Sequence, residues 1–488
     1  MKNFLKIVIL LLSVALFQNC AKKDGIPADV EINDFVWKGM NAYYLYQDQI
    51  PDLSDRRFGS DSQLNSYLRS FDTPTLFNSL RTSTDTDSRL IDDYTNLELI
   101  PLRTATTNGM EFGIIAEPNH ADNVIGYVIS VLPNSFASTK NIIRGEFFNA
   151  IDGTQLTRDN YLSILVNGNS NFTLEMANFD GTTVVSNAKT VDLEKTIYNY
   201  QPINMHKTIT VGTNNIAYLF YNNDFSSNYI NNINSAFLDF KNQNANELIL
   251  DLRHNIGTGG FIKNITEIAT MITGQFTATD ETFIKKTWNT KAQPWFEKNQ
   301  PDSLLTKFPE KLNATTNFNS LQLTDVYIIL NGNNFTGSSA IELLINSLQP
   351  HINVHIIGNQ TAGNNTGSIT LYNSIDYDSI GKSVNHTVAI QPKVVRFLNN
   401  NDQTFENGIT PTMQICTTEN ILDLGVLGDV SDPLLNRVLD YITSGNIGVA
   451  PPCNPNDFEF LYNSINSQRT IDTGIFIKQD LPNTINDD

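Results

Sequence analysis

The sequence has few cysteines, few basic residues and no long apolar run beyond its first twenty residues. Only 3 of its 488 residues are cysteine, which excludes a small fold held together by many disulfides. Lys and Arg number 32 against 51 Asp and Glu, for a formal charge of -19. So acidic a surface repels phosphate backbones, and we expect no nucleic acid as a partner. Without an apolar run of about 18 residues, the body of the chain is not expected to span a membrane.

The remaining composition is that of a folded, multi-domain protein. Hydrophobic residues make up 40%, aromatic residues 10% and charged residues 17% of the chain, which excludes a largely disordered protein. A length of 488 residues predicts several domains and a large buried core.

Residues 1–20 have the pattern of an export signal. Lys2 and Lys6 precede an apolar stretch, and Cys20 follows that stretch directly, with polar residues after it. This arrangement resembles a bacterial lipoprotein signal, in which the cysteine becomes the lipidated first residue; a plain cleaved signal is the alternative. We therefore expect an exported protein, anchored through lipid on Cys20 to the periplasmic or cell-surface side of a bacterial envelope membrane.

The other two cysteines are Cys416 and Cys453. An exported chain meets an oxidising compartment, so a disulfide between them is a candidate, with two unpaired thiols as the alternative. No histidine lies near either one, and His351 and His355 lack flanking ligands. We therefore predict no metal site and no cofactor.

The periodicity of apolar residues changes along the chain. Residues 25–100 show helical spacing, for example at Phe35, Val36, Met40 and Tyr43, and predict a helical N-terminal domain. Residues 106–178 read as short strands. Over residues 205–445 strands alternate with amphipathic helices, which predicts an α/β domain with a polar insertion at about 290–322. The polar tail, residues 454–488, gives no basis for predicting structure.

Two loops of the α/β region carry candidate chemistry. Residues 251–260 run from a buried strand into a glycine-rich loop, and residues 334–342 lead into an apolar helix. A serine at a helix N-terminus, such as Ser339, lies near free backbone N–H groups that can stabilise an oxyanion. By itself, such a serine is more often a helix cap.

Between the helical N-terminal region and the α/β region, within residues 106–178, two segments resemble parts of a PDZ domain. Residues 144–154 match its central strand and turn, and residues 109–113 resemble its carboxylate-binding loop, whose N–H groups hold a peptide C-terminus. The resemblance therefore implies a polypeptide ligand bound by Gly109, Met110, Glu111, Phe112 and Gly113. Glu111 stands where glycine is usual, and its charge opposes capture of a carboxylate.

In order and spacing, the motifs from about residue 34 to 442 resemble the carboxyl-terminal processing, or tail-specific, serine peptidases with an embedded PDZ domain. The resemblance implies a peptidase domain of stacked β-β-α units and a polypeptide substrate. It implies Ser339 as nucleophile and the backbone N–H groups of Ala340 and Gly257 as oxyanion donors. The lysine that serves this family as general base corresponds to Asn364 here, and the residue that orients it corresponds to Ser368.

The exchange of lysine for asparagine bears directly on catalysis. A serine hydroxyl needs an adjacent base, and a neutral amide does not accept its proton. Loss of one member of such a unit costs on the order of 10⁴- to 10⁶-fold in rate. Two functions follow: a catalytically impaired serine endopeptidase, or a pseudopeptidase that binds peptides or scaffolds a partner. The other candidate bases are His254, expected to face solvent in its loop, and, without motif support, Lys382, His386 and Lys393.

Overall fold

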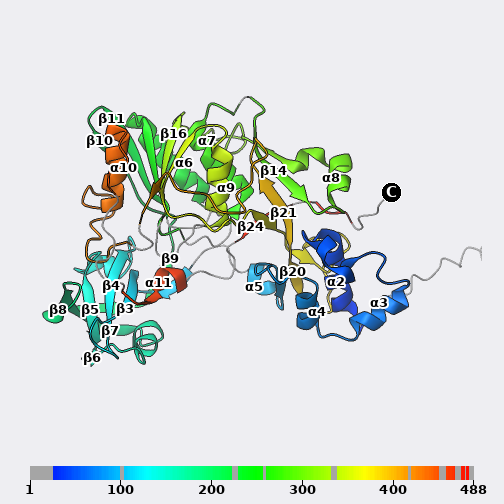
Figure 1. The fold of residues 1–488 in the computed structure, drawn as a ribbon, viewed down its shortest axis with the longest axis horizontal. Helices are drawn as coiled ribbons and strands as arrows, with labels where there is room; N and C mark the ends of the chain where they lie inside the picture. The colour runs from blue at the N-terminus through cyan, green and yellow to red at the C-terminus, as the bar shows by residue number, and fades with distance from the viewer. Residues whose placement is uncertain are drawn as a thin grey trace, which may run out of the picture.

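The computed structural model describes residues 26–98, 104–221, 229–255, 260–277, 279–330, 338–415, 419–449, 458–467, 474–478 and 480–482. A large body of sheets and helices carries two lobes, one of N-terminal helices and one of antiparallel strands (Figure 1). The predicted α/β, multi-domain fold is confirmed.

The body is built on a six-stranded sheet with the order β10-β11-β12-β16-β17-β22. β10 is antiparallel to β11, whereas each later neighbour is parallel to the strand before it. The strands are Ile203–Val211, Asn214–Tyr221, Glu247–Asp251, Asp325–Ile329, Asn353–Gly358 and Met413–Gln414. Successive side chains of β11, β12 and β16 are buried on opposite faces, so both faces of the sheet must be covered.

Three helices pack on one face of this sheet and one on the other. α6 (Ile230–Asn242), α7 (Ile262–Thr273) and α9 (Ser339–Leu348) share a core with Leu219, Leu250 and Ile328. α10 (Pro433–Ser444) covers the opposite face (Figure 1). This layering is the pattern that alternating strands and helices predict.

A second sheet packs beside the same helices, in the order β13-β24-β18-β21-β14-β15. Its strands are Gly260–Phe261, Ile475–Phe476, Thr366–Ser368, Lys393–Leu398, Thr282–Trp288 and Leu305–Lys307. α8 (Gln293–Asn299) and a 3₁₀ turn (Pro301–Leu304) connect β14 to β15. The polar insertion predicted near 290–322 therefore contributes a helix and an edge strand.

The N-terminal lobe contains α2 (Glu31–Tyr43), α3 (Asp61–Leu68), α4 (Thr73–Ser79) and α5 (Thr95–Glu98), with 3₁₀ turns at Gln47–Gln49 and Pro51–Leu53. A short strand, β1 (Arg89–Ile91), pairs with β20 (Ala389–Gln391), which also pairs with β19 (Leu371–Tyr372). The lobe therefore joins the body through strands as well as through its apolar helix faces.

The second lobe, named here the small β domain, spans residues 110–194. It contains β3 (Met110–Ala116), β4 (Val124–Val131), β5 (Phe147–Ile151), β6 (Thr154–Gln155), β7 (Asn171–Phe179) and β8 (Val184–Glu194), with a helical turn at Leu162–Val166 and a 3₁₀ turn at Ala137–Thr139. A pair of strands, β2 (Thr104–Thr107) and β9 (Thr196–Asn199), connects it to the body.

The C-terminal tail forms strands in both sheet systems, although its sequence gave no basis for predicting any. β23 (Phe460–Asn463) pairs with β3, and a helical turn, α11 (Ser464–Ser467), follows it. β24 lies between β13 and β18. Three apolar residues of these segments, Ile465, Ile475 and Ile477, are buried by partners distant in sequence, which explains why the local sequence gave no basis for predicting them.

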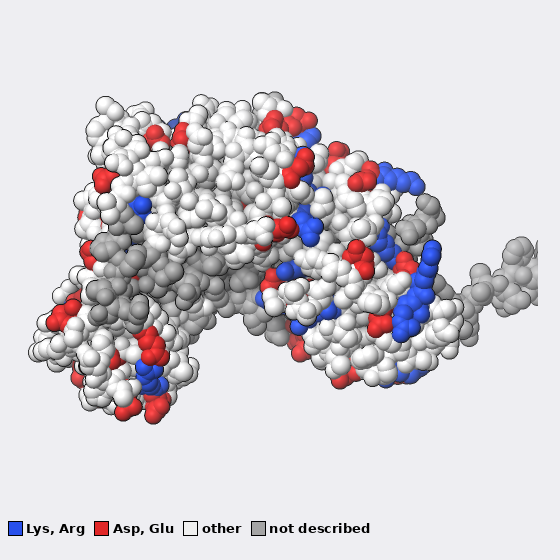
Figure 2. Space-filling model, viewed as in Figure 1, with Lys and Arg blue, Asp and Glu red and all other residues white. Residues whose placement is uncertain are grey.

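Charges on the visible face of the molecule are scattered among uncharged side chains and form no continuous basic surface (Figure 2). Among the helices in the described residues, none is long and apolar enough to cross a membrane.

Candidate active site

The carboxyl ends of β12, β16 and β17 meet at one edge of the central sheet, because these strands are parallel neighbours. In open α/β sheets this edge is where ligands bind. Arg253 and His254 follow β12, α9 follows β16, and Thr361 follows β17. The fold thus brings the described parts of the two candidate loops, residues 251–255 and 338–342, to the same edge of the sheet.

Ser339 is the first residue of α9 and is buried. The helix is capped by its neighbour Ser338, whose hydroxyl accepts a hydrogen bond from the Ile341 N–H at 3.3 Å. Ser339 is therefore not the capping residue. Ala340, in the same first turn, has a backbone N–H without an intrahelical acceptor. The positive end of the helix dipole lies at this turn, which suits an oxyanion.

Glu342, one turn further along α9, fixes the loop that follows β17. Its buried carboxylate accepts hydrogen bonds from the N–H groups of Gly363 (2.6 Å) and Asn364 (3.0 Å). Burial nevertheless raises the pKa of Glu342. Gly363 has a φ of 88°, and a Cβ there would lie 2.4 Å from the Glu406 carbonyl oxygen. The turn thus requires glycine, and it places Asn364 against the first turns of the helix that begins with Ser339.

The side chain of Asn364 takes part in hydrogen bonds through both its amide nitrogen and its oxygen. Its Nδ2 donates to Asp87 Oδ2 at 3.2 Å, and its Oδ1 accepts from the Thr366 hydroxyl at 2.9 Å. Asp87 comes from the N-terminal lobe, so the Asn364 side chain is held by contacts from two parts of the chain. Nothing in the sequence pattern pointed to Asp87.

A lysine lies next to this position, on the other side of Asp87. Lys393 Nζ is 2.7 Å from Asp87 Oδ2 and 3.8 Å from Asp85 Oδ1. Lys393 begins β21 and pairs with Ser368 of β18. One carboxylate thus contacts both the Asn364 amide and the Lys393 amine.

His254 is buried, at 2% exposure, and the expectation that it faces solvent is wrong. Its ring packs edge-on against Phe220, with 5.3 Å between the ring centroids, and its Nδ1 lies 3.8 Å from Glu111 Oε2. Burial, assisted by the positive charge of Arg144, lowers the pKa of His254 to about 3. The imidazole is therefore neutral at pH 7. The small β domain covers it, and this cover could not be predicted from the loop itself.

A buried ion cluster lies beside His254, formed by Asp251, Arg253, Glu419, Asp432 and Arg144. Within it the Arg253 guanidinium lies 2.8 Å from the carboxylate of Asp251, 2.9 Å from that of Asp432 and 3.0 Å from that of Glu419. Arg144 of the small β domain lies 2.7 Å from the same Glu419 oxygen. Burial opposes ionisation of Glu419, but Arg144 and Arg253 lower its pKa to about 2. Arg253 followed a buried strand in the sequence, and this signal could have revealed the cluster.

The other predicted residues fall elsewhere. Gly257, Cys20, Cys416 and Cys453 lie outside the described residues. Lys382 Nζ lies 4.2 Å from the ring centroid of Tyr94 and 5.0 Å from that of Tyr372. His386 Nε2 lies 2.9 Å from Asn373 Nδ2. Neither contact involves the loops of the candidate site, so neither residue gains support as a base.

The predicted peptide-binding residues form a strand more than a loop. Gly109 precedes β3, whereas Met110, Glu111, Phe112 and Gly113 are part of it. The expectation of a loop across all five residues is therefore wrong; their role in peptide binding stays a prediction. Glu111 is buried, and its carboxylate accepts a short hydrogen bond from the Ser130 hydroxyl.

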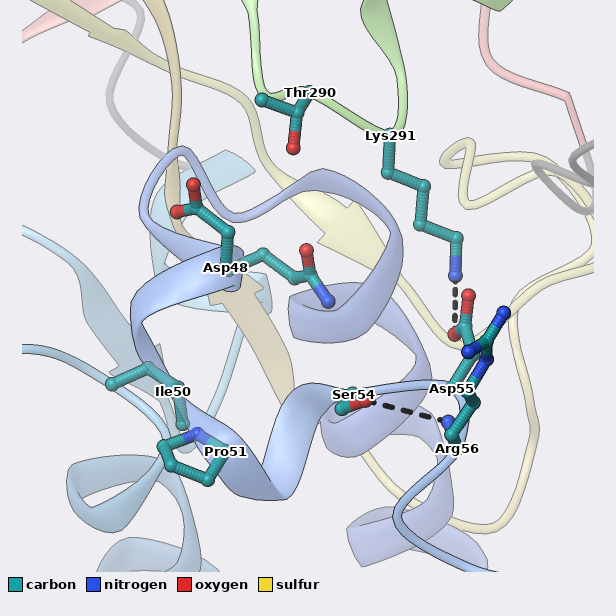
Figure 3. Close-up of a pocket in the computed structure, with 9 residues that line it drawn as sticks. Asp48, Ile50, Pro51, Ser54, Asp55, Arg56, Thr290 and Lys291 are labelled. Carbon is teal, nitrogen blue, oxygen red and sulfur yellow. Dashed lines mark hydrogen bonds and ion pairs between the residues drawn. The ribbon is translucent and has the colours of Figure 1, made fainter.

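A surface pocket of about 360 Å³ lies where the 3₁₀ turns of the N-terminal lobe meet residues 290–291. Lys291 points across it to Asp55, with 2.6 Å between the amine and the carboxylate (Figure 3). None of the predicted catalytic residues lines this pocket, and it contributes nothing to the candidate site. Within the described residues, no group of three or more His, Cys, Asp or Glu is placed to hold a metal ion.

Comparison with known proteins gives a consistent family. The model of peptidase family S41 matches residues 215–415, and the model of the peptidase S41 N-terminal domain matches residues 31–95. No curated protein matches the sequence significantly.

Among solved structures, the chain is similar to a putative S41 protease from Bacteroides fragilis, with a TM-score of 0.63 at 18% identity, covering 84% of this chain and 97% of that one. It is also similar to the photosystem II D1 C-terminal processing protease, with a TM-score of 0.42 at 15% identity, covering 80% of this chain and 94% of that one. The first likeness supports the fold. With both family models matched in order, this chain belongs to peptidase family S41.

Proposed function

We propose that this chain binds extended polypeptide segments on the S41 framework and hydrolyses them only slowly. The observation that carries the proposal is Asn364. By the motif resemblance Asn364 corresponds to the family's general base, and its amide is hydrogen-bonded to Asp87 and Thr366. The rest of the framework supports binding: Ser339 starts a capped helix, and Glu342 fixes the adjoining turn.

The chemistry of the amide explains why hydrolysis is slow. A serine attacks a peptide carbonyl only as its proton leaves, and the family's lysine accepts that proton as a neutral, desolvated amine. An asparagine carbonyl oxygen is far too weak a base for this step. The oxyanion donors of the α9 N-terminus remain, and these alone supply only a small part of the acceleration of a complete site.

A second candidate, a Ser339-dependent endopeptidase with Lys393 as its base, is favoured by one distance. Lys393 Nζ lies 2.7 Å from the carboxylate that also binds the Asn364 amide. A shift of Asp87 on substrate binding would release this amine beside the site. Under this candidate the enzyme is active, and Lys393→Met abolishes its activity.

Restoring the lysine tests the first proposal. Asn364→Lys is expected to create cleavage of an unfolded, fluorescently labelled polypeptide, at a rate at least 100-fold above that of the wild-type chain, because it supplies the missing base. The double variant Asn364→Lys, Ser339→Ala is the matched control and is expected to be inert. Rapid cleavage by the wild-type chain that disappears in both Ser339→Ala and Lys393→Met would instead establish the second candidate.

Binding is measured separately from cleavage. Ser339→Ala removes one hydroxyl and is expected to bind the unfolded polypeptide as tightly as the wild-type chain does, as judged by fluorescence anisotropy. If neither protein binds the polypeptide and Asn364→Lys remains inert, both the binding and the peptidase interpretations are wrong.

The cellular location belongs to the same proposal. We infer from the lipoprotein-type signal that Cys20 carries lipid and holds the chain on an envelope membrane, where exported polypeptides would meet it. Cys20→Ser is expected to release the protein from the membrane fraction and to abolish incorporation of radiolabelled palmitate. Retention of the variant on the membrane would contradict this anchoring.

A further inference from the structure

The C-terminal tail adds a strand to the small β domain. β23 pairs antiparallel with β3, with Phe460 opposite Ile115 and Asn463 opposite Gly113. The ladder is extended by the Ala116 N–H, which donates to the Glu459 carbonyl oxygen at 2.9 Å. More than 340 residues separate the two strands in sequence. An extended segment added to an exposed sheet edge is one of the recurring ways in which domains bind peptides.

The tail also satisfies the backbone at the start of the same strand. The Phe112 N–H donates to the Ser464 hydroxyl at 2.8 Å, in a buried position. Phe112 lies in the segment that resembles a carboxylate-binding loop, so a neutral hydroxyl stands where a carboxylate oxygen was expected. The adjacent Glu111 carboxylate is buried and would repel an anion, whereas it tolerates a hydroxyl. This edge is therefore suited to an internal peptide segment.

Side chains of the tail contact both faces of the small β domain. The Tyr462 ring packs on Phe112 at 5.7 Å and on Tyr161 at 6.2 Å, measured between centroids. On the opposite face Ile465 is buried in the cluster formed by β3, β4 and β5. The Arg158 guanidinium forms two hydrogen bonds with the Glu459 carboxylate, at 2.9 and 2.5 Å. Through these contacts the small β domain recognises a segment that carries both aromatic and aliphatic side chains.

The two strands of the tail differ in burial. All four residues of β23 remain partly exposed, whereas Ile475 in β24 is fully buried between β13 and β18. Strands with few buried apolar contacts open at a lower free energy than core strands do. β24 thus anchors the tail, and β23 can leave its edge while the anchor stays in place.

We propose that residues 458–467 are an intramolecular ligand of the small β domain, and that the β3 edge binds internal peptide segments of the same kind. Such segments are extended, have aromatic or aliphatic residues at neighbouring positions and are followed by a serine or threonine hydroxyl. The tail competes with them and keeps the edge closed until a better ligand displaces it. This inference rests on the proposed function, because it names the site at which polypeptide is bound.

The test uses a fluorescent peptide of sequence FEFLYNSINS, residues 458–467, with acetylated and amidated ends. The double variant Leu461→Asp, Tyr462→Asp undocks β23 and leaves β24 unchanged. Because the tethered tail is present at an effective concentration on the order of mM, undocking is expected to tighten peptide binding by about 100-fold in fluorescence anisotropy. Replacing the serine at position 464 of the peptide by alanine is expected to weaken binding roughly five-fold, through loss of one hydrogen bond.

The matched control is Ile447→Asp, Val449→Asp, which adds the same charges at exposed positions before the tail. It is expected to bind the peptide as weakly as the wild-type chain does. If the undocked variant keeps a cooperative thermal transition but binds no more peptide than this control, β23 is a fixed structural strand and the proposal is wrong. A version of the peptide ending at serine 464 with a free carboxylate that binds more tightly would show capture of a C-terminus instead, contrary to the proposal.

If the undocked variant fails to fold, amide hydrogen exchange on the unaltered protein provides an independent test of whether β23 opens before β24. Amides of residues 460–463 are expected to exchange at least 100-fold faster than those of residues 475–477, and equal protection would overturn the proposal. Failure here is distinct from failure of the proposed function: cleavage by Asn364→Lys would still establish the latter even if the peptide does not bind at the β3 edge.

Discussion

The two sides of the candidate site, after β12 and after β17, differ in how deeply their charged side chains are buried. After β12, the Arg253 guanidinium is fully buried and contacts the carboxylates of Asp251, Asp432 and Glu419. Asn364, in the loop after β17, belongs to a half-buried group of three side chains. In this group the Asp87 carboxylate contacts both the Asn364 amide and the Lys393 amine. The first arrangement can lose no member without stranding a buried charge. The second is partly exposed, so a substitution there is expected to cost less stability.

The largest effect is expected from breaking the buried ion cluster. Arg253→Met leaves three buried carboxylates near one another, and we expect the free energy of unfolding to fall by about 4 kcal/mol. Urea denaturation at pH 7 measures this loss. Arg57→Met, which removes an exposed partner of Asp52, is the control and should change stability by less than about 1 kcal/mol. Equal effects of the two substitutions would erase the contrast between the two regions.

Acid should weaken the same cluster through Glu419. The pKa of Glu419 is about 2 in the folded chain against an ordinary value of 4.5. Its contribution to stability is therefore complete above about pH 4.5 and is lost as the pH falls toward 2. The difference corresponds to about 3 kcal/mol. Denaturation of the wild-type chain and of Glu419→Gln at pH 5 and pH 2 checks this prediction, and the variant should lose less stability over that range.

Lys286 is the converse of the Arg253 cluster: its amine is buried, but it forms no ion pair among the described residues, so its removal is expected to stabilise the protein. Burial lowers its pKa to about 8 from 10.5. Below pH 8 the folded chain carries a desolvated ammonium, and this penalty disappears as the pH rises from 8 to 10.5. Lys286→Met is therefore expected to raise the free energy of unfolding at pH 7 by about 2 kcal/mol.

The matched control for Lys286 is its neighbour Lys285, which is ion-paired with Asp402 at 2.7 Å. Lys285→Met should shift the urea midpoint little, and its stability should follow the wild-type dependence on pH between 8 and 10.5. A Lys286→Met protein that is less stable than the wild type would show that the amine has a partner that stabilises it.

The smallest effect is expected at Asp87, which contacts Asn364 and Lys393. Asp87→Asn keeps a hydrogen-bond acceptor for Asn364 but removes the charge that faces Lys393. Because this pair is partly exposed, we expect a change in unfolding free energy of less than about 1 kcal/mol. A loss as large as that of Arg253→Met would mean that both regions are equally rigid.

The sequence predicted the regular elements of the body well. Strands were expected to alternate with amphipathic helices over residues 205–445, and β11, α6, β12, α7, β16, α9 and β17 follow the chain in that alternation. These elements are long, periodic and locally encoded. Ser339 and Asn364, which the resemblance assigns to one site, lie in neighbouring elements, because the Glu342 carboxylate of α9 accepts a hydrogen bond from the Asn364 N–H.

What could not be predicted depends on contacts between distant segments. His254 is buried because the small β domain covers its loop, and Asp87 reaches Asn364 from the N-terminal lobe. The tail forms strands because β3, β13 and β18 offer unpaired edges, which no local pattern in residues 458–478 reveals.

The position of β24 has a consequence for biosynthesis. In the described part of the second sheet, β13 is joined to β18 only through β24, so residues 260–261 wait for a strand that the ribosome makes more than 200 residues later. Folding of the second sheet is therefore expected to finish only after residues 475–476 have been synthesised, and a chain that stops before them is expected to leave the facing edges of β13 and β18 without their β24 partner.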